Sequence, residues 1–208
     1  MAIRRVGIIP AAGHADRFNG TLKELLPISK DKVIMDYAIE AMEIGGCNPI
    51  VCVTSIRKVA ALAEKSPDLL YTIQTQTRDI WGAILAGLAV EADEYCFAMP
   101  DTIIPEFAFK RKMDFDFMLG TFETNMPERF GMIRDYAIVN KMKGDPGKTW
   151  GVLMWTRKVR DYWLNYDYDI NNYTHAFNMA RTWAKWETFD IEGYTDISSF
   201  EDYRSFIS

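Results

Sequence analysis

Residues 5–28 read RVGIIPAAGHADRFNGTLKELLPI, and this stretch decides the fold. Residues 5–10 are mostly apolar and end in a proline, so we predict a buried β-strand there. The loop that follows holds small residues at 11–13 and then two cations, Arg17 and Lys23, six positions apart. Small residues let a ligand approach backbone N–H groups, and N–H groups together with Arg and Lys bind phosphate. The stretch therefore predicts a strand followed by a phosphate-binding loop.

This loop has the spacing of neither a Walker loop nor a GxGxxG turn, which disfavours ordinary P-loop kinase and dinucleotide-binding folds. Downstream, apolar runs and amphipathic segments alternate through the first hundred residues. We predict strands at 5–10, 50–54, 70–76 and 95–99, and helices at 34–42, 57–65 and 80–92. Strand and helix alternating in this rhythm indicate a parallel sheet with helices on both faces.

The second half has a different pattern, with many aromatic residues and turn-rich connections. Strands are predicted at 115–122, 130–133, 137–142 and 150–155, and helices at 156–164, 172–186 and 198–207. Ser198 or Ser199 would be the N-cap of the last helix. No repeat or linker interrupts the chain, so we predict one domain over residues 1–208. The expected fold class is α/β, a three-layer α/β/α sandwich with a mixed, mostly parallel central sheet.

Composition limits the classes of partner. The chain has 208 residues, is 49% hydrophobic and 25% charged, and carries a formal net charge of −5. No strongly basic face is required, so nucleic acid is not an expected partner. No apolar run approaches the ~20 residues that span a bilayer, so we expect a cytoplasmic protein without membrane contacts. The three cysteines have no CxxC spacing and are interpreted as small buried hydrophobes.

In sheets of this type, ligands bind at the carboxyl ends of the strands. Two polar segments fall at such ends, namely the loop at 11–23 and the turn at Asp101, directly after the strand at 95–99. The sequence therefore predicts a ligand site at this edge, with Asp101 as its acidic residue.

The loop resembles the signature of the sugar-phosphate nucleotidyltransferases, (L/P)AAGxGTRL…PKxLLPI, and most of all that of glucose-1-phosphate thymidylyltransferases. Further segments resemble motifs of that family in the same order along the chain. The matching segments are PAAGHADRF (10–18), LKELLPI (22–28), MPDTI (99–103), NMPERFGMI (125–133), YDIN (168–171) and YTDISSFEDY (194–203). The resemblance implies a Rossmann-like nucleotidyltransferase fold. It also implies that an NTP and a sugar 1-phosphate give an NDP-sugar and pyrophosphate by in-line displacement.

The resemblance also implies roles for individual residues. Asp101 would bind Mg²⁺, with Asp196 as the second carboxylate, because hard oxygen ligands suit this ion. Arg17 would hold the triphosphate and the leaving pyrophosphate. Lys23 would neutralise the α-phosphate under attack. Arg17, Lys23 and Asp101 are therefore the candidate catalytic residues.

Other positions would bind the two substrates, with residues 1–110 as the nucleotide-binding half and 111–208 as the sugar-phosphate-binding half. Candidates for nucleotide contact are Ala11, Ala12, Gly13, Gly82 and either Gln74 or Gln76, the last two as readers of the base edge. Candidates for sugar-phosphate contact are Lys143, its alternate Lys141, and Gly131. Enzymes of this family commonly form dimers or tetramers, so a homo-oligomer is compatible with the resemblance.

Departures from the family pattern keep other functions open. Asp16 puts a carboxylate where the family has a hydroxyl near the phosphates, and Met142-Lys143 replaces the family's Glu-Lys. One alternative is a cytidylyltransferase acting on an alditol-type phosphate. Another is a catalytically inactive nucleotide or nucleotide-sugar sensor of the same fold. A glycosyltransferase of the related fold would need a D-x-D motif at the end of the fourth strand, where this chain has only Asp101. The D-x-D at 167–169 comes too late in the chain.

Overall fold

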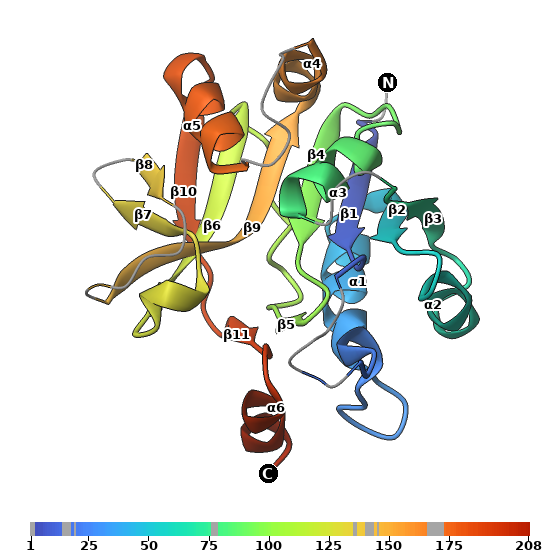
Figure 1. The fold of residues 1–208 in the computed structure, drawn as a ribbon. Coiled ribbons are helices and arrows are strands. Elements are labelled where there is room, and N and C mark those ends of the chain that lie inside the picture. The colour runs from blue at the N-terminus through green and yellow to red at the C-terminus, as the bar shows by residue number, and fades with distance from the viewer. Residues whose placement is uncertain are drawn as a thin grey trace.

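A mixed β-sheet forms the middle layer of the molecule (Figure 1). The computed structural model describes residues 3–13, 18, 20–75, 79–134, 137–139, 144, 146–165 and 173–208. The strands of this sheet are β1 (Arg5–Pro10), β2 (Cys47–Thr54), β3 (Leu70–Ile73), β4 (Glu94–Ala98), β6 (Phe117–Thr124), β7 (Met132–Arg134), β8 (Ala137–Val139), β9 (Gly147–Thr156) and β10 (Trp186–Asp190). Their main path runs β10-β6-β9-β4-β1-β2-β3, and β7 and β8 form a side branch on β9.

The strand directions confirm the predicted mixed, mostly parallel sheet. The strands β4, β1, β2 and β3 are mutually parallel, and β10 is parallel to β6. Only β9 runs against its neighbours on the main path, β4 on one side and β6 on the other. This reversal separates the βαβ part of the chain from the aromatic-rich part, as the change in sequence pattern at about residue 110 indicates.

Helices cover both faces of the sheet and complete the predicted three layers (Figure 1). The helices are α1 (Ile34–Ile44), α2 (Val59–Lys65), α3 (Ile80–Gly87), α4 (Arg157–Asn165), α5 (Tyr173–Trp183) and α6 (Phe200–Ile207), with the 3₁₀ turns η2 (Lys23–Leu25) and η3 (Pro127–Arg129). One core cluster lies under α3, α4 and α5 and contains Trp81, Trp163 and Phe177. A second, on the opposite face, lies under α1 and α2 and contains Met42 and Leu62.

Three predicted boundaries are wrong by several residues. The helix expected to reach 92 ends at Gly87, and the N–H of Ala92 donates instead to the Tyr95 hydroxyl at 2.9 Å. The strand expected to reach 76 ends at Ile73. The helix expected to reach 186 ends at Trp183, and Trp186 begins β10 instead. Only Phe189 of β10 is buried, so this strand has no apolar alternation that its sequence could display.

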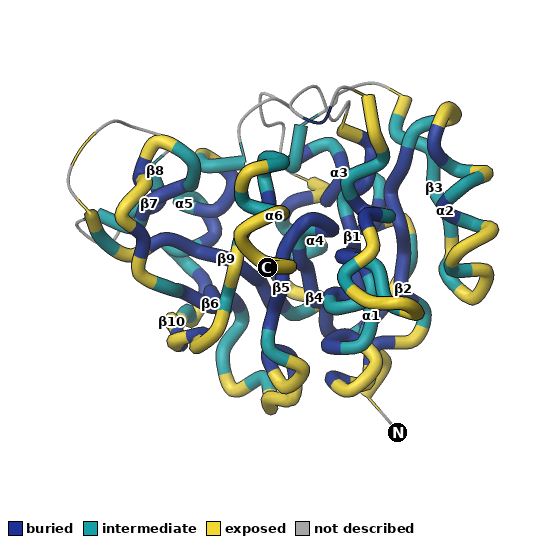
Figure 2. The backbone as a smooth tube through the Cα atoms, turned by 90° about the horizontal axis from the view of Figure 1, so that it is seen from below, coloured by how far each residue is buried: buried dark blue, intermediate teal, exposed yellow. Residues whose placement is uncertain are grey.

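A small second sheet, which the sequence did not predict, closes the lower edge of the molecule. It pairs β5 (Thr102–Ile103) with β11 (Thr195–Asp196) in antiparallel register. The C-terminal helix α6 follows it, with Ser199 as the N-cap that accepts from Asp202 N–H. Figure 2, viewed from below, shows α6 partly exposed over the buried β5. The Phe200 ring packs on Phe18 at 4.8 Å between centroids, which ties α6 to the loop after β1.

The cysteines behave as small hydrophobes, as predicted. Cys47, Cys52 and Cys96 are all free and buried. Burial, followed by the charge of Glu24, raises the pKa of Cys52 to about 12, so this thiol stays protonated and unreactive at neutral pH. In the part of the chain that the structure describes, no helix is long and apolar enough to cross a bilayer.

Gly87 gives a test of the packing between α3 and the sheet. We expect Gly87→Ala to lower the free energy of unfolding by about 1–3 kcal/mol, because overpacking a closed core displaces its neighbours. An added Cβ would lie 2.6 Å from Ile8 Cδ1 and 2.8 Å from two further Ile8 carbons. Urea unfolding followed by tryptophan fluorescence measures the change. The matched control is Gly147→Ala, whose Cβ would meet, among the described residues, only Met132 Cε at 3.5 Å. Equal stability of the two variants would contradict the packing described.

Candidate functional site

The candidate site lies where two loops leave the carboxyl edge of the parallel strands. β1 and β4 are neighbours in the sheet, so the loop after Pro10 and the turn after Ala98 emerge side by side. The first loop is tied to β2 because the Ala11 N–H donates to Val53 O at 2.7 Å. This is the edge at which open α/β sheets bind ligands.

A pocket of about 100 Å³ lies between these loops and α3. Its lining residues are Pro10, Ala12, Gly13, Lys23, Glu24, Gln74, Asp79, Ile80, Ala83, Met99 and Pro100. The predicted residues Ala12, Gly13, Lys23 and Gln74 are thus brought together, although they come from three separate segments. Ala11 is fully buried beside them. The pocket is smaller than the ~300 Å³ of a typical small-molecule site, so its size suits part of a nucleotide.

Gly82, predicted to lie near the base, has a role in the helix start. Its backbone N–H donates to Asp79 Oδ1 at 2.8 Å, which makes Asp79 the N-cap of α3. Gln74 lies just beyond β3, where its side-chain Nε2 donates to the backbone O of Asp79 at 3.2 Å. The polar groups at the start of α3 therefore hold one another in place beside the pocket.

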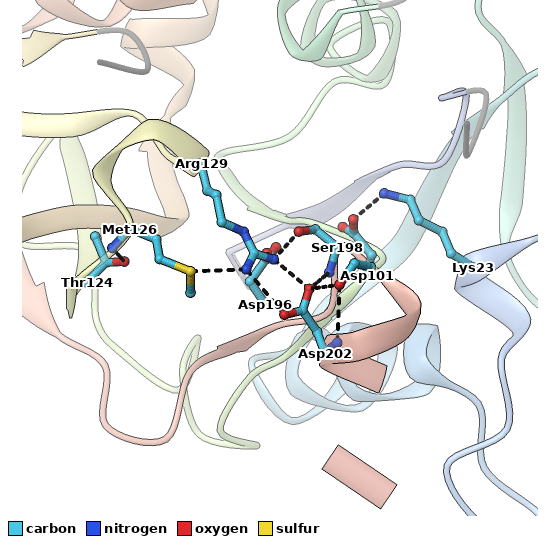
Figure 3. Close-up of polar contacts among 9 residues, drawn as sticks. Lys23, Asp101, Thr124, Met126, Arg129, Asp196, Ser198 and Asp202 are labelled. Carbon is cyan, nitrogen blue, oxygen red and sulfur yellow. Dashed lines mark hydrogen bonds and ion pairs between the residues drawn. The ribbon is translucent and has the colours of Figure 1, made fainter. Parts of the chain in front are cut away.

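Asp101 and Lys23 form an ion pair at this edge of the sheet (Figure 3). Asp101 is only 4% exposed. Its Oδ2 binds Lys23 Nζ, whereas its Oδ1 is buried and has no hydrogen-bond partner among the described residues. A buried carboxylate oxygen without a partner is costly unless a ligand satisfies it. This oxygen therefore marks a position for a cation or a donor group.

Asp196 lies next to Asp101. Two carboxylates that bind one Mg²⁺, as the sequence resemblance implies, must be close to each other. It stands opposite Thr102 in the β5–β11 pair, and the adjacent Ile197 N–H donates to Asp101 O at 3.0 Å. Burial raises the pKa of Asp196, and the negative charge of Asp101 raises it further. Two carboxylates that repel one another form a site for a positive charge.

Arg129 joins Asp196 to the C-terminal helix (Figure 3). Its Nη2 donates to Asp196 Oδ2 at 2.8 Å and to Asp202 Oδ2 at 2.7 Å, and it also contacts the Ser198 hydroxyl. Its Nη1 donates to Asp202 Oδ1 at 3.2 Å. These bonds raise the pKa of Arg129, the bond to Asp202 first. The guanidinium thus holds β11 and α6 against η3.

We expect Arg129→Ala to lower the free energy of unfolding by about 2 kcal/mol, since it leaves two partly buried carboxylates without their cation. Chemical unfolding measures the global effect, and limited proteolysis after Arg204 reports release of α6. Arg129→Lys serves as the matched variant, because it keeps the charge but loses the two-pronged contact with Asp202. Unchanged stability and unchanged proteolysis in the alanine variant would contradict this role.

Sequence reasoning missed Arg129, Asp202, Glu24 and Asp79 as members of the site. Arg129 lay within the quoted segment 125–133, but only Gly131 was taken from it. The signal that was available for Arg129 was its place as the one cation in the segment 125–133. Its partners lie 67 and 73 positions away, and no local pattern identifies them.

Most of the remaining candidates fall on residues that the structure does not describe. Arg17, Gln76, Lys141 and Lys143 lie outside the described residues, as do Asp16 and the D-x-D at 167–169. Gly131 lies beside β7, where an added Cβ would meet Trp150 Nε1 at 2.7 Å and the Tyr173 hydroxyl at 3.0 Å. This glycine is thus required by packing against the aromatic core.

The residues present fit a magnesium ion. Among the described residues no group of three or more His, Cys, Asp or Glu side chains could hold a metal by itself. Mg²⁺, however, is typically bound through one or two carboxylates together with substrate phosphates and water. Asp101, with its bare buried Oδ1, and the adjacent Asp196 provide that donor set.

Solved structures of nucleotidyltransferases share this fold across the whole chain. A Bacillus anthracis protein assigned provisionally as a glucose-1-phosphate thymidylyltransferase matches with a TM-score of 0.81 at 17% identity, covering 98% of this chain and 94% of that one. A UDP-glucose pyrophosphorylase complexed with UDP-glucose matches with a TM-score of 0.77 at 19% identity, covering 99% and 97%. The inositol-1-phosphate CTP transferase from T. maritima matches with a TM-score of 0.71 at 17% identity, covering 99% and 94%.

These likenesses define the class of protein, an α/β protein with the nucleotidyltransferase fold. Residues 7–109 match the model of the MobA-like NTP transferase domain, which assigns this part of the chain to the NTP transferases. No curated protein matches the sequence. The family match covers the strands and loops that build the pocket and Asp101.

Proposed function

We propose that this protein transfers a nucleotidyl group from an NTP to a sugar 1-phosphate, giving an NDP-sugar and pyrophosphate. The observation that carries the proposal is the Asp101–Lys23 ion pair, which lies next to a pocket at the strand edge. Asp101 Oδ1 has no hydrogen-bond partner among the described residues, and Asp196 lies beside it. This arrangement combines cation-binding and anion-binding groups at one point. Such a combination is what the meeting of two phosphate anions requires.

In this proposal the NTP is bound by the first half of the chain, about 1–110. Ala12 and Gly13 line the pocket and would let the nucleotide approach the backbone. Gln74, or Gln76 as the alternate, would lie beside the base. Arg17 would hold the β- and γ-phosphates that leave as pyrophosphate. Asp101 and Asp196 would hold Mg²⁺, which neutralises phosphate charge when it is bound.

The chemical step needs no general base. A sugar 1-phosphate is largely a dianion at neutral pH, because the second pKa of a phosphate monoester is about 6. One of its oxygens attacks the α-phosphorus of the NTP, the bond to the pyrophosphate oxygen breaks, and no covalent enzyme intermediate forms. Lys23 would leave Asp101 and follow the α-phosphate as negative charge builds there.

The acceptor would be bound by the second half, about 111–208. Lys143, with Lys141 as the alternate, and the segment around Gly131 are the proposed sugar-phosphate contacts. The family match ends at residue 109, so these acceptor contacts lie outside the matched range. A non-hexose acceptor stays within the proposal, because the family's acidic sugar contact is replaced by Met142.

The test is Mg²⁺-dependent release of pyrophosphate from each common NTP against a panel of sugar 1-phosphates and alditol phosphates. We expect release with one preferred NTP and one preferred acceptor, and none without acceptor. Asp101→Asn is the control for contaminating activities. Silence across the panel, in a protein that still binds a nucleotide, would contradict the proposal and favour a nucleotide sensor.

A further inference from the structure

We propose that the pocket between β1 and α3 selects a base that carries an exocyclic amino group, namely adenine, cytosine or guanine, over uracil and thymine, through the carboxylates of Glu24 and Asp79. The inference rests on the proposed function only in taking this pocket as the base-binding part of the nucleotide site. It concerns which NTP is used, and it rests on two buried carboxylate oxygens that have no hydrogen-bond donor among the described residues.

Glu24 is the first of these acceptors. It follows Lys23 in η2, lines the pocket, and is only 1% exposed. Its Oε1 accepts from Lys58 Nζ at 2.7 Å, and Lys58 is itself 5% exposed. Its Oε2 is buried and has no hydrogen-bond partner in the described part of the chain. A carboxylate that is paired with a lysine is a strong hydrogen-bond acceptor, so Oε2 can accept from a donor group of a ligand.

Asp79 is the second acceptor and lines the same pocket from the start of α3. Its Oδ1 is used by the Gly82 N–H at 2.8 Å, which fixes the orientation of the carboxylate. Its Oδ2 is buried and, among the described residues, has no partner. Two of the described cations near the pocket are already engaged, since Lys23 binds Asp101 and Lys58 binds Glu24.

The base edges differ in what they offer to such a pocket. Adenine and cytosine each present an exocyclic amino group, and guanine presents an amino group next to a ring N–H. Uracil and thymine present a single ring N–H between two carbonyl oxygens, which would lie against the carboxylates. A site built to accept hydrogen bonds rejects a ligand that cannot donate them, because its buried groups stay unpaired. We therefore expect a preference of roughly tenfold or more.

The experiment measures equilibrium binding of ATP, CTP, GTP, UTP and dTTP to the full-length protein by isothermal titration calorimetry, with Mg²⁺ and without acceptor. At least one of the first three is expected to bind tenfold or more tightly than both UTP and dTTP. Asp79→Asn is expected to reduce that ratio at least severalfold, because an amide can donate to a carbonyl. Glu24→Gln is expected to act in the same direction. The matched control Asp161→Asn, on the exposed surface of α4, is expected to leave the ratio unchanged.

Three results would overturn the inference. One is tightest binding of UTP or dTTP. Another is equal binding of the four ribonucleotides with weaker binding of dTTP, which would assign the carboxylates to ribose hydroxyls. The third is an unchanged affinity ratio in Asp79→Asn. This variant keeps the N-cap, so it is expected to fold even if Glu24→Gln, which weakens the pairing with Lys58, unfolds. Because binding is read without turnover, a selective protein that makes no product would refute the proposed reaction alone. Turnover with UTP or dTTP as the preferred donor would refute the base selection alone.

Discussion

Replacing Asp101 by Asn is expected to lower turnover by on the order of a hundredfold or more, because it removes the carboxylate that we propose binds the metal ion. The buried Oδ1 has no hydrogen-bond partner among the described residues, so we expect a bound ligand to offset the cost of burying this charged oxygen. An amide keeps the shape of the side chain but lacks the charge that attracts a divalent cation. Steady-state kcat at saturating Mg²⁺, NTP and acceptor measures the effect.

The matched control for this change is Asp190→Asn. Asp190 is also paired with a lysine, Lys148, but its side chain is 71% exposed at the end of β10. Exposed ion pairs contribute little, so we expect this variant to keep near-wild-type kcat and stability. A kcat of Asp101→Asn close to that of the wild type would remove Asp101 from the metal site.

Replacing Lys23 by Ala is expected to reduce kcat by about a hundredfold while KM for the NTP changes only severalfold. A preorganised charge that acts on the reacting phosphate contributes to the transition state more than to the ground state. In the structure Lys23 Nζ is bound to Asp101, so Lys23 would lie close to a phosphate held near Asp101. Initial-rate kinetics over a matrix of NTP and Mg²⁺ concentrations separate the two parameters.

Lys158→Ala is the matched control, since this lysine forms an ion pair with Asp116 but is 58% exposed and lies on α4. We expect its kinetic constants to equal those of the wild type. An increase in KM for the NTP with unchanged kcat in Lys23→Ala would show that Lys23 binds the ground state only. The role assigned to it at the α-phosphate would then be wrong.

The sequence predicted those parts of the fold that bury an apolar face. All four residues of the run Val6 to Ile9 are buried in β1, and the apolar character of this run was sufficient to identify the strand. β10 was missed because only one of its five residues is buried. The β5–β11 pair was missed because each strand has only two residues, which is too short to show any periodicity.

The candidate site was predictable where its residues follow a strand end. Asp101 and Lys23 were both named from their places after strand-like runs, and the structure joins them in one ion pair. Arg129 could not be found in this way, because its importance comes from Asp196 and Asp202, which fold onto it from the end of the chain. Glu24 was hidden for another reason, since a charged residue after a motif lysine is ordinarily solvent-exposed, whereas here it is buried against Lys58.

The central claim is that the bond broken lies between the α-phosphorus and the pyrophosphate oxygen. ³¹P NMR of a reaction containing the protein, Mg²⁺, the preferred NTP and its acceptor tests this claim directly. We expect the three NTP resonances to be replaced by one pyrophosphate resonance and a coupled pair from the NDP-sugar, in equal molar amounts. Formation of nucleoside diphosphate or orthophosphate without pyrophosphate would contradict it, because cleavage would then have occurred at the γ-phosphate.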